Sequence, residues 1–490
     1  MDVLNKYIEN TLQSLGPFFS EFILIAGIVF LLIAGLIKNK TAVSAVITVL
    51  TLLSSFVFVL IDFVGHEQYF LFGGMISSGD FSNYFKFLFL TAGLLTVFLS
   101  LRDQNPFRSE YYILIIAIIL GAHLLVMSRN FVMAFISLEL ISISSYVLAG
   151  FSFTKKGAEG SLKYFLFGSV ASAIMVYGFS ILYGLTGTLD FNYGDQLTER
   201  LSSVQSPLFL IASLMVLGGF LFKIVAVPMH VWSPDVYEAA PVPVIAFFSV
   251  VPKLAGIGIL CHFISLIRSI DNDAHDWRLI LAAISFLTMT VGNFAALLQK
   301  NPKRMMAYSS IAQSGFLLAG VTSFLPESAS FVLFYSTVYL LMNFLVFLYI
   351  QYFERFEIVS MEGFSGVGKI AVWPSVFCLV GLIALTGLPP TSGFTGKLFI
   401  FSSLWQAYEL TSQPFLLALM IFGLLNTVVS LFFYLKIPYY AFLKAGEPLK
   451  KQNNLTFENL LGLILVLMLL VLFFQPGLLM GWINKITFVN

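Results

Sequence analysis

The chain has 490 residues, of which 59% are hydrophobic and only 10% are charged, and its mean hydropathy is +0.93. Soluble domains average about 25% charged residues, so this composition excludes an ordinary soluble protein and predicts an all-α polytopic membrane protein. The net charge is only +1 and the sequence has no basic run interleaved with aromatic residues, which excludes nucleic acid as a partner.

Fourteen segments are long and apolar enough to cross a membrane, which takes about 20 residues of helix. The segment 63–83 between the second and third is only partly apolar and is typical of a re-entrant or interfacial stretch. In chain order the predicted spans are 21–37, 41–62, 84–101, 111–127, 130–150, 163–186, 206–233, 241–263, 277–298, 303–323, 328–352, 372–409, 414–436 and 457–478.

The loop lysines and arginines favour one side of the membrane by about sixteen to seven. The larger set predicts the cytoplasmic side, which puts both termini on the periplasmic side. The smaller set includes Lys86, counted among the loop residues although it stands at the start of the third predicted span. An even number of spans agrees with termini on one side.

Spans 7 and 12 carry helix breakers. Span 7 contains Pro228 and is followed by Pro234, and span 12 contains Pro389 and Pro390 within TGLPPTSGFTGK. A proline inside a helix removes a backbone donor, so both spans are predicted to be broken helices. Unpaired backbone at membrane depth is tolerated only when it packs against protein or lines a wet cavity.

Each broken span is the fourth helix of a block of five. Paired discontinuous helices at matching positions indicate inverted repeats, so we expect two inverted five-helix repeats, formed by spans 4–8 and 9–13. The predicted parts of the chain are N-terminal helices at 1–110, a first antiporter-like repeat at 111–263, a second at 277–436, and a cytoplasmic loop with the C-terminal helix at 437–490.

Four charged residues lie inside apolar segments, namely Glu139, Lys223, Lys253 and Lys397. A lysine at the bilayer centre costs about 3 kcal/mol on insertion scales, so such residues face a polar interior and mark an ion path. Glu139 shares a helix face with Ser142 and Tyr146 and is the natural partner for one of the lysines. The set points to proton or cation movement, although a purely structural ion pair between helices remains an alternative.

Two further residues are weaker candidates. His230 follows the break in span 7, where a histidine either shuttles protons near neutral pH or pairs with free backbone. Lys163 begins span 6, where it either takes part in transport or anchors the helix at the interface. His123 and His262 lie near helix ends and are expected to be structural.

Cofactor motifs are missing from the sequence. Cys261 and Cys378 lie far apart in apolar stretches and no CxxC occurs, so they cannot form an iron–sulfur or zinc site. There is no GxGxxG after a strand, no GxxxxGK[ST], and no pair of histidines at helical spacing. We therefore expect no cofactor and no metal in this chain.

Five motifs carry a family resemblance that covers residues 110–440. They resemble motifs of the antiporter-like subunits of respiratory complex I, the bacterial NADH-quinone oxidoreductase. The five motifs are ISLELISISSYVLAG, EGSLKYFLFGSVASA, FKIVAVPMHVWSPDVYEAAPVPV, YSSIAQSGFLLAG and GLPPTSGFTGKLFIF. The resemblance is greatest to the subunit N branch. Lys397 stands where subunit M carries a glutamate, YSSIAQ looks like the N version of its motif, and no long lateral helix follows span 14, unlike subunit L.

The resemblance implies a proton-translocating subunit of that enzyme with no redox site of its own. In the family pattern Glu139 pairs with Lys223, Lys253 continues the polar axis, Lys397 completes it, and Lys163 has a modulating role. NADH, FMN, the iron–sulfur clusters and quinone belong to the parent complex. Its membrane-arm subunits and the lipid bilayer are the implied partners, so the chain is expected to be multi-pass in the bacterial inner membrane and part of a hetero-oligomer. Gln313 is a departure, since relatives often carry a histidine there.

Two other functions compete with this one. A multi-subunit cation/proton antiporter of the Mrp type shares the fold and the buried lysines, and is distinguished by dependence on sodium instead of NADH and quinone. A membrane scaffold would use the buried charges only to hold helices together, and would tolerate replacement of each lysine together with its partner.

Overall fold

The computed structural model describes residues 10–37, 41–103, 107–191, 207–271, 276–446 and 457–486. Both termini and part of the predicted cytoplasmic loop, 447–456, lie outside the described residues. The chain divides into two compact units. Unit 1 is Met1–Ile224 with Val251–Trp277 and Ile486–Asn490, and unit 2 is Val225–Val250 with Arg278–Lys485.

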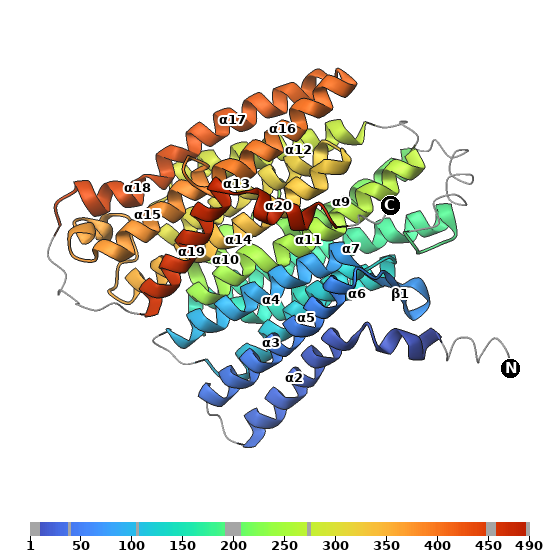
Figure 1. Cartoon of the computed structure of the whole chain (residues 1–490), viewed down its shortest axis with the longest axis horizontal. Coiled ribbons are helices and arrows are strands. Elements are labelled where there is room, and N and C mark those ends of the chain that lie inside the picture. The colour runs from blue at the N-terminus through green and yellow to red at the C-terminus, as the bar shows by residue number, and fades with distance from the viewer. Residues whose placement is uncertain are drawn as a thin grey trace. The chain divides into compact units, whose positions relative to one another are not determined.

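Unit 1 is a bundle of long apolar helices joined by short turns. The helices α2 to α5 pack against one another in chain order and form the blue part of Figure 1. Unit 1 contains α2 (Phe19–Ile37), α3 (Thr41–Gly65), α4 (Asp80–Leu101), α5 (Ser109–Met127), α6 (Phe131–Ala149), α7 (Lys155–Thr186), α9 (Pro207–Ile224) and, from Val251 onward, most of α11 (Val242–Asp271).

The partly apolar segment 63–83 forms a short antiparallel β-hairpin. Strand β1 (Tyr69–Leu71) pairs with β2 (Ile76–Ser78), and a single 3₁₀ turn at Phe72–Gly74 joins them. Gly73 and Gly74 have φ angles of 70° and 87°, which glycine adopts without steric cost. Helix α4 therefore begins at Asp80, four residues before the predicted span.

Unit 2 is also helical. It contains α10 (Ser233–Ala239), the start of α11, α12 (Trp277–Leu297), α13 (Pro302–Thr322), α14 (Pro326–Glu354), α15 (Val372–Thr386), α16 (Ser392–Thr411), α17 (Pro414–Tyr434), α18 (Lys436–Pro438), a π-turn at Tyr439–Leu443, α19 (Phe457–Phe474) and α20 (Gly477–Ile483). Two 3₁₀ turns, Glu362–Phe364 and Val367–Lys369, precede α15.

The predicted fold class, an all-α polytopic membrane protein, is confirmed. Within the described residues, twelve helices are long and apolar enough to cross a membrane, and a thirteenth span results if the bent pair Glu362–Lys369 and Val372–Thr386 counts as one. Each of the fourteen predicted segments coincides with a helix or a broken pair of helices. Helices α13 and α16 fall outside the twelve although both are about as long as the others. Both contain polar residues that the candidate site uses.

The two predicted breaks are present. Helix α9 ends at Ile224, irregular backbone follows up to Trp232, and α10 continues after it. Helix α15 ends at Thr386, Gly387 with a φ of 85° caps it, and α16 begins at Ser392. The inverted relation of the two five-helix blocks, and domain boundaries at 111–263 and 277–436, stay predictions.

Candidate functional site

Lys223 lies in the last turn of α9, immediately before the break, and its side chain is buried. Its ammonium Nζ donates a hydrogen bond to Ser142 Oγ on α6 over 3.1 Å. Ser142 belongs to the polar face predicted for this helix, and Tyr146 on the same face is buried as well. That face is therefore directed at least in part toward α9.

Glu139 is half-buried one turn before Ser142 on α6. Its Oε1 accepts a short hydrogen bond from Ser172 Oγ on α7. Among the described residues no ion pair joins Glu139 to Lys223, although the carboxylate is near enough for its charge to act on the ammonium group. Lys223 therefore contacts a neutral hydroxyl directly and a carboxylate only at longer range.

Lys253 is fully buried in α11, which continues as a helix through Pro252. Gly256 lies one turn after it on the same face. A methyl group added at Gly256 would lie 2.7 Å from Ile224 Cγ2 and 3.4 Å from Lys223 Cβ. The missing side chain thus lets the end of α9 pack directly on α11, which brings the backbone that carries Lys223 within one helical turn of Lys253.

Lys397 is the buried lysine of unit 2, on α16. Its Nζ donates to the carbonyl oxygens of Leu385 at 3.1 Å and Thr386 at 2.8 Å, the last two residues of α15. The last carbonyls of a helix have no intrahelical partner and carry partial negative charge, so they are natural acceptors for a cation. The ring of Phe316 lies 4.2 Å below the ammonium group and adds a cation–π contact.

Gln313 connects Lys397 to a set of buried hydroxyl groups. Its Nε2 donates to the same Leu385 carbonyl at 3.0 Å and to Tyr434 Oη at 3.3 Å, and its Oε1 accepts a short hydrogen bond from Tyr335 Oη. Tyr434 Oη in turn lies 2.5 Å from Ser309 Oγ. Lys397 and Gln313 therefore share the Leu385 carbonyl oxygen as an acceptor, and the Gln313 amide also contacts the hydroxyls of Tyr335 and Tyr434.

Lys163 and His230 are the two weaker candidates from the sequence. Lys163 is on the exposed surface of α7, where its Nζ pairs with Glu159 at 3.0 Å one turn earlier. This position fits an interface anchor better than a buried carrier. His230 is half-buried in the irregular backbone after the break, within unit 2.

Sequence reasoning missed one buried cluster in unit 1. Glu21, Lys86 and His123 are fully buried, and the lysine and the histidine both contact the Glu21 carboxylate. The assignment of Lys86 to a loop was wrong, because α4 begins at Asp80 and holds Lys86 two turns inside the helix. The only signal was that all three charges stand near ends of predicted spans, and the packing of α2, α4 and α5 is what brings them together.

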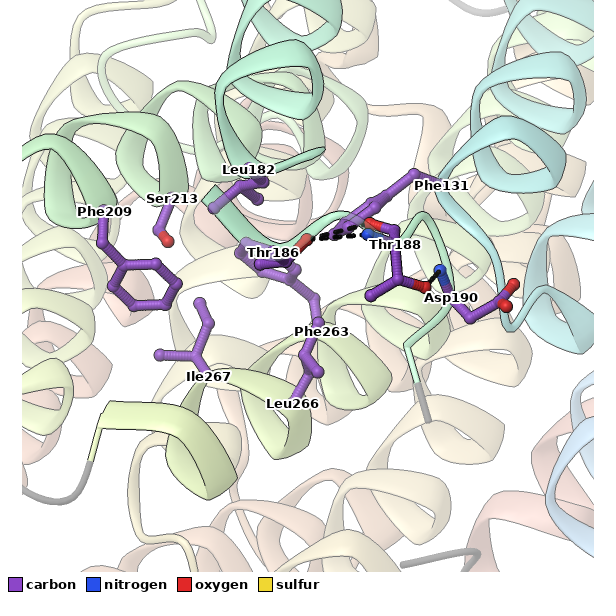
Figure 2. Close-up of a pocket in the computed structure, with 10 residues that line it drawn as sticks. All are labelled: Phe131, Leu182, Thr186, Thr188, Asp190, Phe209, Ser213, Phe263, Leu266 and Ile267. Atoms are coloured by element: carbon purple, nitrogen blue, oxygen red, sulfur yellow. Dashed lines mark hydrogen bonds between the residues drawn. The ribbon is translucent and has the colours of Figure 1, made fainter. Parts of the chain in front are cut away.

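Unit 1 also has a pocket. Figure 2 shows it lined mostly by apolar side chains from α6, α7, α9 and α11, including Leu182, Phe209 and Ile267. The one carboxylate at its edge, Asp190, accepts a 2.5 Å hydrogen bond from Asn130 Nδ2. None of the candidate charged residues lines this pocket.

The paired breaks and the buried lysines define the class of protein, a polytopic helical membrane protein of the antiporter-like type. The family model described as "NADH:quinone oxidoreductase/Mrp antiporter, TM" matches residues 128–430. The chain belongs to this family, and the resemblance read from the motifs is confirmed.

Relatives within the family agree with the subunit N branch. The chain is 38% identical to NADH-quinone oxidoreductase subunit N 2 of Chloroherpeton thalassium, over 84% of this chain and 81% of the relative. Among solved structures it is similar to a chain of respiratory complex I from Thermus thermophilus with bound Aureothin, with TM-score 0.79, 27% identity, and coverage of 94% of this chain and 98% of that one. A chain of the Mrp complex from Dietzia sp. DQ12-45-1b has TM-score 0.84 and 19% identity over 97% of both chains, which shows the fold alone.

Proposed function

We propose that the chain is a proton-translocating membrane subunit of an NADH-quinone oxidoreductase, and that Glu139, Lys223, Lys253 and Lys397 carry its protons. The observation that carries the proposal is Lys223, a buried lysine at a helix break whose Nζ rests on Ser142 Oγ with Glu139 only at longer range. The names of the relatives supply the electron-transfer reaction to which the movement is coupled.

In unit 1 the proposed carriers are Glu139, Lys223 and Lys253. When the carboxylate of Glu139 is near Lys223, it favours the ammonium form, and when the two separate, that support is lost. Lys223 then releases its proton toward Lys253, whose helix packs on the end of α9 at Gly256. Interacting groups of this kind titrate as a set and not one by one.

In unit 2 the proposed carrier is Lys397. Two carbonyls at the end of α15 hold its protonated form, and the Leu385 carbonyl also accepts from Gln313. The Gln313 amide also contacts the hydroxyls of Tyr335 and Tyr434, and Tyr434 contacts Ser309; each of these hydroxyls is both a donor and an acceptor. The Leu385 carbonyl only accepts, so a proton released by Lys397 reaches these hydroxyls through an intervening water.

The proposed setting follows the relatives. The chain is multi-pass in the bacterial inner membrane with both termini on the periplasmic side, beside other membrane-arm subunits of the complex. The chain holds no redox cofactor in this proposal, and NADH, FMN, iron–sulfur clusters and quinone act in other parts of the complex. Lys163 and His230 are assigned secondary roles at most.

The second candidate function is a subunit of an Mrp-type cation/proton antiporter. The structural similarity to the Mrp complex favours it as much as the similarity to complex I, with TM-scores of 0.84 and 0.79. Sequence identity favours the first function, at 38% and 27% against 19%. The fold is compatible with proton movement in both proposed functions. Dependence on NADH and quinone, or on sodium, therefore distinguishes them.

Removal of the chain tests which source of energy is used. In inverted membrane vesicles from cells that lack the chain, we expect NADH-driven acidification to be lost and sodium/proton exchange without NADH to be unchanged. Expression of the wild-type chain should restore acidification, as followed with a pH-sensitive dye. NADH oxidation with an artificial electron acceptor controls for the integrity of the rest of the complex. Loss of sodium/proton exchange with intact NADH-driven acidification would assign the chain to the Mrp class instead.

A further inference from the structure

A second cluster of titratable groups lies in the N-terminal helices of unit 1. Glu21 on α2, Lys86 on α4 and His123 on α5 are each fully buried. Lys86 Nζ lies 2.9 Å and His123 Nδ1 lies 3.0 Å from the same carboxylate oxygen, Glu21 Oε1. The cluster precedes residue 128, where the match to the family model begins, and shares no residue with the candidate site.

The hydrogen bonds of this cluster are incomplete. Among the described residues, neither Glu21 Oε2 nor His123 Nε2 has a hydrogen-bond partner, and Ser20 Oγ beside them has none either. A buried polar atom without a partner costs about 1–3 kcal/mol, so a cluster that served only to join helices would be expected to satisfy these atoms. The open positions are a carboxylate oxygen and an imidazole nitrogen, both of which accept protons.

Other charged groups stand farther out. The charge of Asp62 on α3 interacts with Lys86 and Glu21. Asp80, at the start of α4, is paired with His66 at 3.1 Å. Glu139 on α6 is hydrogen-bonded to Ser172. Glu110 at the start of α5 is exposed. None of these groups is in direct contact with the free His123 Nε2.

The geometry allows a balanced proton exchange through the imidazole ring. While Nδ1–H donates to Glu21 Oε1, the ring is neutral and Nε2 carries a lone pair. A proton that binds Nε2 makes the ring an imidazolium, and the Nδ1 proton then passes to Glu21 Oε1. One N–H bond forms, one breaks, and the carboxylate gains one proton. Histidine suits this role because its two nitrogens lie on opposite sides of the ring.

We propose that Glu21, Lys86 and His123 form a second proton-exchange site, in the N-terminal helices of unit 1 and separate from the lysines of the candidate site. Lys86 holds Glu21 as a carboxylate, and His123 brings the proton to it. The proposal rests on the proposed function in one respect, namely that the ion moved by this chain is the proton.

The test separates proton exchange from helix packing. Replacing a buried ion pair by neutral groups of similar volume is often neutral for stability, so Glu21→Gln with Lys86→Met preserves a packing role and removes titration. His123→Gln keeps a donor toward Glu21 and also removes titration. The matched control is Arg355→Gln with Glu458→Gln, which removes an ion pair of 2.9 Å in unit 2.

The measurement is the number of protons moved per NADH oxidised, in inverted vesicles with the assembled complex, with Lys223→Ala beside these variants. We expect a lower proton yield in the Glu21/Lys86 double variant and in His123→Gln, and a wild-type yield in the control. If the double variant fails to assemble, as judged on native gels, His123→Gln decides alone.

Three results would overturn the proposal. A wild-type yield in the double variant and in His123→Gln, with a lowered yield in Lys223→Ala, would refute the second site alone. A wild-type yield in Lys223→Ala as well would refute the proposed function. A lowered yield in the Arg355/Glu458 control would show that the loss reflects disturbed packing.

Discussion

Replacing Lys223 with arginine is expected to stop proton movement through this chain while the chain still assembles. Arginine keeps the positive charge and can donate to Ser142, so the contacts around α9 survive. Free arginine holds its proton about two to three pKa units more strongly than free lysine, so its neutral form is rarer by a factor on the order of 100 to 1000. A carrier that must release its proton in each cycle cannot function when so small a fraction of its side chains is neutral.

The measurement for Lys223→Arg is the proton yield per NADH oxidised in inverted vesicles. Lys303→Arg is the matched control, because Lys303 makes fixed contacts with Ala240 O and Glu354 that need only a cation and a donor. Its proton yield should equal that of the wild type. A normal yield in Lys223→Arg would exclude release of a proton from this side chain and would leave it a purely electrostatic role.

Two substitutions of Lys397 are expected to have the same effect on transport and different effects on stability. Lys397→Met removes the donor to the carbonyls of Leu385 and Thr386 and leaves buried acceptors unpaired. Each such loss costs about 1–3 kcal/mol, so the variant should unfold at lower temperature and also lose transport. Lys397→Arg keeps the cation at the end of α15, so it should be as stable as the wild type and still fail to move protons.

Thermal unfolding of the purified complex and the proton yield in vesicles check the two expectations together. Ser403→Ala on the same helix serves as a control for substitution in α16, since its hydroxyl bonds only the backbone of its own helix. Full proton yield in Lys397→Arg would contradict a role for this lysine as a carrier. Equal stability of Lys397→Met and the wild type would contradict the account of the helix end.

The fold and the broken helices could be predicted because they depend on local sequence. Apolar length alone predicts the spans. The proline in span 7 and the Pro-Pro pair in span 12 predict the breaks, since they remove backbone donors wherever the helices pack. The buried lysines also stand out individually, because a charge within an apolar run is costly whatever surrounds it.

The partners of these charges could not be predicted from local sequence. Lys397 is held by carbonyls of α15, and any residue type could supply a carbonyl. In the sequence Gln313 stands out only as a departure from relatives that carry a histidine. In the structure its amide donates to the carbonyl that also accepts from Lys397. Such contacts depend on the angle at which two helices meet, which no pattern within one helix encodes.

The assignment of Lys86 to a loop was wrong because the start of α4 was placed too late in the sequence. Lys86 was counted with the loop residues because it stands at the start of the predicted span 84–101, whereas the hairpin β1–β2 ends at Ser78 and α4 starts at Asp80. The extra turn places Lys86 inside the bundle, against Glu21. Its positive charge therefore contributes to a buried cluster and does not count toward the orientation of the chain.

The most direct test of the central claim is the proton yield per NADH in inverted vesicles that carry wild type or Lys223→Ala, at equal amounts of assembled complex. We predict that Lys223→Ala lowers the number of protons moved per NADH, because the carrier at the break of α9 is removed. An unchanged yield at the same rate of NADH oxidation would contradict the claim that this chain moves protons through Lys223.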